Sequence, residues 1–258
     1  MDKDTILQRY LSALLDGDRP RSRSTIEEAM QKGIPAYSVY TEIIWPVMLE
    51  VETLLRSDKT TAVCEHLATR INRTIVDQLQ NKLPRRPVTG KKILVCCAPG
   101  ELHELGAQMT ADLFESAGWE VRFVGGGLTN DDILAFSNEY APEILLIYGT
   151  APRQAPDVRR LIDTIRDVNA HPNMKIMVSG GVFNRAEGLW EEIGADLFAE
   201  SAARAVQVAS DTTCIAPARP TINRRKKNRR QRPQPLPDRL KPQTPSPALT
   251  AAVGAGLN

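Results

Sequence analysis

The residues best suited to chemistry lie in the stretch "PGELHELGAQ", Pro99–Gln108, which follows an apolar run and opens an expected helix. His103 is one of three histidines in the chain, and Glu101 stands two residues before it. A carboxylate in that place accepts a hydrogen bond from one ring nitrogen and leaves the other nitrogen free to bind a metal. Gly106, about one helical turn later, has no side chain, so a large ligand can approach the backbone there. The alternative interpretation is that His103 only begins the helix and that its ring is hydrogen-bonded to backbone groups.

From Lys91 onward, short apolar runs alternate with amphipathic segments. The sequence predicts strands at 93–97, 120–124, 144–148, 175–179 and 195–199. It predicts helices at 102–117, 131–139, 154–168, 184–193 and 201–210. Near-continuous apolar strands separated by helices indicate a doubly wound α/β domain with a parallel sheet over 90–211. His103 follows the first strand, and ligands of such sheets bind beyond the carboxyl ends of the strands.

Residues 1–86 show helical periodicity and are predicted to form a small bundle of about four helices. In "TILQRYLSALLDGD" the apolar residues recur on one helix face, and Gly17 ends the segment. Pro46, within "IPAYSVYTEIIWPVMLEVETLLRS", predicts a break or kink. The segment "TTAVCEHLATRINRTIVDQLQNKL" is expected to form a long final helix, and "PRRPVTG" a linker.

The segment 212–258 differs in composition from the rest of the chain. It contains ten Lys and Arg and one acid, Asp238, whereas the preceding residues include 23 basic and 30 acidic side chains. Its richness in Pro, Arg, Lys and Gln predicts a disordered tail. The run "NRRKKNRR" is interpreted as a solvated charge run, or as a site for nucleic acid, anionic lipid or an acidic partner.

Several classes of protein are not favoured by the sequence. There is no run of about 18 apolar residues, which a transmembrane helix requires. The opening "MDKDTILQRY" lacks the pattern of a secretory signal, and the four cysteines form no C-x-x-C pair, so a cytoplasmic setting is expected. Ala107 stands where a zinc-protease motif requires a second histidine. We therefore expect a binding protein more than an enzyme.

The stretch "ELHELG" resembles the D-x-H-x-x-G signature of cobalamin-binding domains, with Glu101 in place of the aspartate. The resemblance implies a Rossmann-like, flavodoxin-like domain in which His103 binds cobalt from below and replaces the cofactor's own base. The family also has a glycine pair after the fourth strand, which Gly180 and Gly181 in "VSGGVF" match. Because the detached nucleotide tail slides between strand ends and helices, glycines such as Gly106 are expected to line its slot.

The segment after the third strand departs from the family pattern, which has S-x-L at this point. This chain reads "YGTA" instead. On the strand alignment, Tyr148 or Gly149 takes the serine position, and Thr150 or Ala151 takes the leucine position. A tyrosine that points into the slot would block the nucleotide base, whereas Thr150 would restore the hydrogen bond of the missing serine.

The helical half, 1–86, resembles the cap of cobalamin-dependent photoreceptor regulators and of methyl-carrying corrinoid proteins. The regulators carry W-x9-E-H, whereas this chain has Leu55, nine intervening residues, and then Glu65 and His66. The resemblance implies that Leu55 is a small apolar lid, that Glu65 and His66 face the upper side of cobalt, and that His66 is a second cobalt ligand. The alternative interpretation is that Glu65 and His66 begin a helix and cap it electrostatically.

Three hypotheses about function follow from the resemblance. The first is a cobalamin-binding sensor or regulator, in which His66 coordinates cobalt after light or a redox change removes the upper ligand. The second is a corrinoid carrier that moves a methyl group between partner methyltransferases. The third is a degenerate domain without cofactor, which Tyr148 and Leu55 favour. The expected cofactor is adenosyl- or methylcobalamin, and the expected protein partners are a second copy of the chain, a regulatory protein or a methyltransferase.

Overall fold

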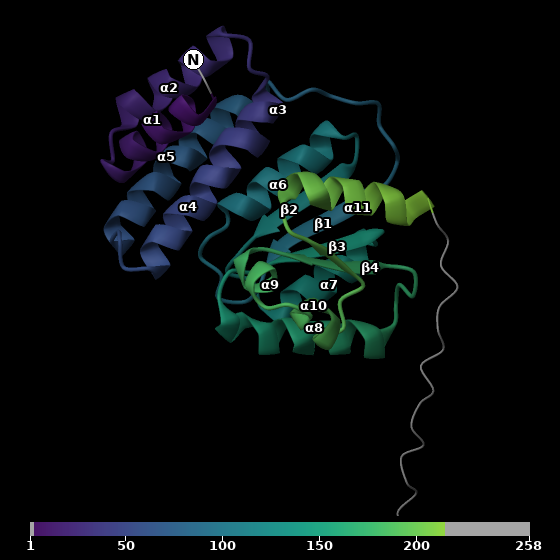
Figure 1. Ribbon diagram of the computed structural model, residues 1–258. Coiled ribbons are helices and arrows are strands. Elements are labelled where there is room, and N and C mark those ends of the chain that lie inside the picture. The colour runs from purple at the N-terminus through teal and green to yellow at the C-terminus, as the bar shows by residue number, and fades with distance from the viewer. Residues whose placement is uncertain (1–2, 215–258) are drawn as a thin grey trace, which may run out of the picture. The chain divides into compact units, whose positions relative to one another are not determined.

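The structure, a computed structural model, describes residues 3–214. Its helical half comprises α1 (Lys3–Leu15), α2 (Arg19–Gln31), α3 (Ala36–Ser38), the π-helical turn η1 (Val39–Ile44), α4 (Trp45–Arg56) and α5 (Ala62–Gln80) (Figure 1). Helices α1, α2, α4 and α5 pack on one another as a bundle. Within the described residues, no helix is long and apolar enough to cross a bilayer. The disorder is predicted over 212–258, but residues 212–214 form the end of a helix that runs to Cys214, and 215–258 lie outside the described residues.

The predicted break at Pro46 is replaced by a local change of helical pitch. Pro46 occupies the first turn of α4, where it has no N–H to donate and its ring collides with the carbonyl four residues earlier. The chain accommodates the ring by passing through η1, whose π-helical hydrogen bonds skip one more residue than those of an α-helix. Backbone angles remain helical across the junction, so α4 continues directly from η1.

The second half is a doubly wound α/β domain, as predicted. Its strands are β1 (Lys92–Cys97), β2 (Glu120–Gly125), β3 (Ile144–Tyr148), β4 (Lys175–Ser179) and β5 (Leu197–Ala199). Its helices are α6 (Leu105–Ser116), α7 (Asn130–Tyr140), η2 (Pro152–Gln154), α8 (Ala155–Val168), α9 (Gly181–Arg185), α10 (Leu189–Glu192) and α11 (Ala202–Cys214). All strand pairs are parallel, in the order β2-β1-β3-β4-β5. β1 and β3 are therefore neighbours, and the order in which strands are added to the sheet reverses at this point.

Two predicted helices differ from the observed ones for local reasons. The helix predicted over 102–117 begins only at Leu105, because the backbone before it is engaged by the carboxylate of Glu101. Leu102, the first residue of the predicted helix, is 79% exposed. The helix predicted over 184–193 is divided into α9 and α10, since Gly188 between them has a φ of +76°.

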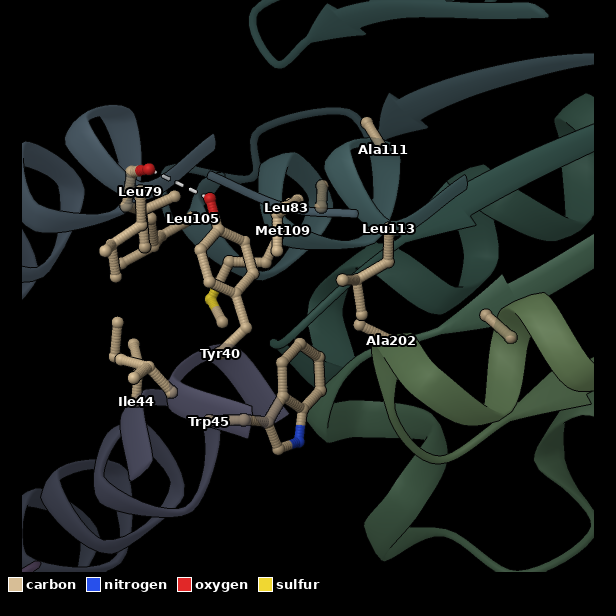
Figure 2. Close-up of a cluster of buried hydrophobic side chains, with 14 of the residues drawn as sticks. Tyr40, Ile44, Trp45, Leu79, Leu83, Leu105, Met109, Ala111, Leu113 and Ala202 are labelled. Atoms are coloured by element: carbon tan, nitrogen blue, oxygen red, sulfur yellow. Dashed lines mark hydrogen bonds between the residues drawn. The ribbon is translucent and has the colours of Figure 1, made fainter. Parts of the chain in front are cut away.

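The sheet separates two apolar cores. One core lies under α7, α8 and α9, and the other lies on the opposite face of the sheet with α6, α11 and the helical half. Figure 2 shows Tyr40 and Trp45 of the helical half against Leu105, Met109 and Leu113. The two halves of 3–214 thus share one continuous core, which places α4 and α5 next to the carboxyl ends of the central strands.

Asp112, on α6, is buried in this shared core and makes stability depend on pH. The Tyr40 hydroxyl lies 2.9 Å from the Val76 carbonyl oxygen and 3.1 Å from Oδ2 of Asp112. Since the hydroxyl has one proton, it donates to Val76 while a protonated Asp112 donates to it. Burial is the main reason that the pKa of Asp112 is raised to about 6.

We therefore expect the protein to lose stability as the pH rises through 6. The folded pKa lies above the unfolded one, so the stabilising form is the protonated acid, present at low pH and lost as Asp112 ionises. The loss between pH 5 and pH 8 should be on the order of 2 kcal/mol in the free energy of unfolding. Urea unfolding measures it. D112N, which keeps a donor to Tyr40 but cannot ionise, should remove this part of the pH dependence, and an unchanged pH dependence in D112N would contradict the assignment.

Candidate functional site

One buried carboxylate, that of Glu101, organises the loop between β1 and α6. Its Oε1 accepts hydrogen bonds from the backbone N–H groups of Leu102 and His103, both at 2.8 Å. Its Oε2 accepts hydrogen bonds from the backbone N–H of Thr150 at 2.6 Å and from the Thr150 hydroxyl at 2.7 Å. Burial alone would raise the pKa of Glu101, but the hydrogen bonds from His103 and Thr150 lower it to about 2. The carboxylate therefore ties together the loops that follow β1 and β3.

His103 lies between carboxylates from the two halves of the protein. Its Nδ1 is 3.2 Å from Oε1 of Glu101, and its Nε2 is 3.7 Å from Oε2 of Glu65 on α5. Glu101 and then Glu65 raise the pKa of His103 to about 10, more than burial lowers it. Glu101 fixes the orientation of the ring through Nδ1, so Nε2 is the nitrogen that would meet a metal, once Glu65 moves away and Nε2 loses its proton.

A cavity of about 310 Å³ adjoins His103, between α4, α5 and the loops after β1 and β3. The helical half lines it mainly with apolar side chains, which include Trp45, Met48, Leu49, Val51, Leu55 and Ala68. The α/β domain contributes His103, Leu105, Gly106, Tyr148, Thr150, Ala151, Pro152 and Arg185. The cavity is thus an apolar space with an imidazole and a few polar groups at its edge, the usual character of a site for an organic cofactor.

The structure brings several predicted site residues to this cavity. The ones that line it are His103, Gly106, Thr150, Leu55 and Glu65. Glu101 lies behind them as the hydrogen-bond partner of both His103 and Thr150. Of the two residues that the sequence left open for the leucine position, Thr150 is the one that bonds to Glu101. Residues from α4, α5 and two strand ends therefore converge on one space.

The remaining predicted glycines, Gly149, Gly180 and Gly181, lie at the ends of β3 and β4 beside this space. Gly180 has a φ of +106°, and a Cβ there would collide with the Gly149 carbonyl oxygen. A Cβ on Gly181 would come 3.0 Å from Oε1 of Glu52. Gly180 is therefore required for α9 to begin so close to the strand end, whereas a side chain at Gly181 would meet only the movable ends of Glu52 and Arg185.

His66 lies on the outer face of α5 and is not among the residues that line the cavity. Its side chain is 70% exposed and shares a separate surface hollow with Val63 and Leu67. Successive side chains of a helix point about 100° apart. Glu65 lines the cavity and His66 does not, but the two side chains are in contact, since Nε2 of His66 lies 3.7 Å from the same Oε2 of Glu65 that faces His103.

Sequence reasoning missed an ion pair that joins the two halves beside the cavity. Arg185 on α9 pairs with Glu52 on α4 and also donates to the backbone carbonyl of Thr150. The two charged residues are 133 positions apart, so no local sequence pattern predicts the pair. A second contact between the halves joins Arg73 of α5 to Glu104 at 2.9 Å.

These residues fit the cobalt-bearing ring of a corrinoid but not its nucleotide tail. A single oriented imidazole beside an apolar cavity is the donor that a cobalt centre needs from below. The slot for a nucleotide tail fits poorly, because the ring of Tyr148 fills the space beside Gly106. A Cβ placed on Gly106 would lie 2.5 Å from Cζ of Tyr148 and 2.9 Å from Cε2.

Comparison with known proteins identifies the family. A family model described as "B12 binding domain" matches residues 91–209, and a second one with the same description matches 6–80. The chain is 22% identical over 214 residues to dimethylamine corrinoid protein 1 of Methanosarcina acetivorans, which covers 82% of this chain and 99% of that protein. It is 21% identical over 215 residues to monomethylamine corrinoid protein 2 of the same organism, with coverages of 81% and 98%.

The solved structure of the Methanosarcina barkeri monomethylamine corrinoid protein has the same fold. It superimposes with a TM-score of 0.74 at 18% identity, over 82% of this chain and all of that one. The likeness includes the helical half as well as the α/β domain, since together they make up the matched length. The chain therefore belongs to the B12-binding protein family, and its cofactor is a corrinoid.

Proposed function

We propose that the protein is a corrinoid carrier, in which His103 binds cobalt from below and α4 and α5 cover the opposite face. The observation that carries the proposal is the hydrogen-bonded series from Thr150 through Glu101 to His103 beside the cavity. A bound corrinoid supplies a metal centre that accepts and gives up a methyl group. The protein's own residues orient the lower ligand, exclude water from the cavity and let the helical half open.

Two observations favour a carrier over the sensor or regulator that the sequence placed first. The two M. acetivorans relatives match this chain over 98–99% of their own length, and both are named methylamine corrinoid proteins. His66, which the regulator hypothesis uses as an upper ligand, is 70% exposed and does not line the cavity, although its Nε2 lies 3.7 Å from Oε2 of Glu65. We infer that the protein partners are methyltransferases, one that delivers a methyl group and one that removes it.

The helical half acts as a movable lid in this proposal. Leu55 and its apolar neighbours on α4 cover the cavity, and Glu65 lies on the Nε2 side of His103. Because Glu65 on α5 stands against Nε2 of His103, α4 and α5 move outward to admit a corrinoid in this proposal. The contacts that would have to yield include the Arg185–Glu52 ion pair, the approach of Glu65 to His103 and part of the packing between the two halves.

Reconstitution of the full chain tests the proposal. The protein is mixed with hydroxocobalamin, methylcobalamin or cobinamide, passed through a desalting column, and its absorption spectrum is recorded in the dark and after illumination. We expect a retained corrinoid with a histidine-bound spectrum. Reduction with Ti(III) citrate followed by methyl iodide should then give a methylated cobalt spectrum on the protein.

Other outcomes would replace the proposal. Retention of no corrinoid would favour the degenerate domain that the sequence also allowed. A light-dependent change of ligand that is lost in H66A would favour the regulator, because it would require His66 to enter the site.

A further inference from the structure

Tyr148 closes the space between the end of β3 and the start of α6. It is the last residue of β3 and is paired with Cys97, the last residue of β1, so it lies at the same edge of the sheet as the loop of His103. Its side chain is buried, with 7% of the residue exposed. Its ring rests directly on Gly106, where even one added carbon would lie 2.5 Å from Cζ. No second flat group fits between the ring and the helix.

This position matters because of where a corrinoid tail would have to go. When His103 takes the place of the cofactor's own base, that base and its ribose phosphate must leave the lower face of the ring beside the histidine. Gly106 is three residues after His103, on the first turn of α6, and both residues line the same cavity. A tail that runs from His103 into the interior would pass Gly106. The ring of Tyr148 fills the space beside Gly106.

The ring is not easily displaced. Tyr148 ends a strand whose five residues are all buried. Turning the ring out of the groove would expose an aromatic side chain and leave a void against α6, and voids of this kind cost several kcal/mol in protein cores. A ligand that needs the space between β3 and α6 must first displace the Tyr148 ring. The free energy of that displacement weakens the binding of the ligand.

We propose that Tyr148 determines which corrinoids this protein accepts, and that it favours corrinoids with a short or missing lower tail over those with a complete benzimidazole nucleotide. This inference rests on the proposed corrinoid site at His103. It goes further in assigning selectivity to the volume of one side chain on β3.

Binding titrations with two corrinoids test the inference. Cobinamide has the corrin ring and cobalt but no nucleotide, whereas hydroxocobalamin carries the complete tail. We expect the full chain to bind cobinamide at least about tenfold more tightly than hydroxocobalamin, measured by the change in corrinoid absorption. In Y148S the groove is open, so the affinity for hydroxocobalamin should rise and the ratio should fall toward one.

Y148F is the matched control, because it keeps the ring and removes only the hydroxyl. It should retain the preference for cobinamide, and loss of the preference in Y148F would contradict an effect of side-chain volume. Cobinamide binding by Y148S shows that this variant is folded. Equal affinities of the unsubstituted protein for both corrinoids, or an unchanged preference in Y148S, would overturn the inference while leaving the carrier intact. Failure of every variant to bind either corrinoid would instead overturn the proposed function.

Discussion

In H103A, the histidine-bound spectrum of the retained corrinoid is expected to disappear. His103 is the imidazole that lines the cavity, and Glu101 holds its Nδ1 so that Nε2 is presented to the ligand. Removing the ligand itself should weaken corrinoid binding by more than the roughly 10–100-fold that loss of an outer partner causes at metal sites. The measurement is a binding titration with cobinamide, followed by absorption at the visible bands of the corrinoid.

H66A is the matched control for this prediction. His66 is the same residue type on α5, but its side chain is 70% exposed, lines another hollow and reaches the cavity only through Glu65, 3.7 Å from its Nε2. We expect its affinity and spectrum to equal those of the unsubstituted protein. A histidine-bound spectrum that persists in H103A, or one that is lost in H66A, would show that the lower ligand has been assigned to the wrong residue.

The second large effect is expected at Glu101. The carboxylate is buried and accepts hydrogen bonds from two backbone N–H groups of its own loop and from the N–H and hydroxyl of Thr150. In E101Q an amide NH₂ faces some of these donors, so buried N–H groups lose their acceptor. We expect the free energy of unfolding to fall by about 3 kcal/mol, as is typical when a partner is removed from a buried charged network. Urea unfolding of the full chain measures the change.

E120Q provides the comparison, since it makes the same chemical change at an exposed site. Glu120 is paired with Arg122 at 3.6 Å, and its side chain is 42% exposed. Exposed ion pairs contribute about 0–1 kcal/mol, so E120Q should unfold almost like the unsubstituted protein. If E101Q lost no more stability than E120Q, Glu101 would not be the residue that joins the two loops.

The sequence was sufficient to predict the fold class because its signals were local. Near-continuous apolar runs such as "ILVCC" and "ILLIY" indicate strands buried on both faces, and the structure has β1 and β3 at these positions. The contact between Glu101 and His103 was also foreseen, because two residues in one loop are close whatever the rest of the chain does.

Features that depend on contacts between distant residues were not foreseen. The ion pair of Arg185 with Glu52 joins segments from different halves, and nothing near either residue indicates it. The sequence placed both Glu65 and His66 at the site, whereas in the structure Glu65 lines the cavity and His66, whose Nε2 is 3.7 Å from Oε2 of Glu65, does not. Only the packing of α5 on the α/β domain decides that Glu65 faces His103.

The central claim is that a protein nitrogen, from His103, binds the cobalt of the corrinoid. Electron paramagnetic resonance of the full chain loaded with Co(II) cobinamide tests it most directly, because this corrinoid has no base of its own. In protein grown with ordinary histidine, we predict that each cobalt line is split into a triplet by one nitrogen nucleus. In protein grown with histidine labelled with the heavy nitrogen isotope, the triplet should become a doublet. Cobalt lines without nitrogen splitting, or a splitting that the labelled histidine leaves unchanged, would contradict the claim.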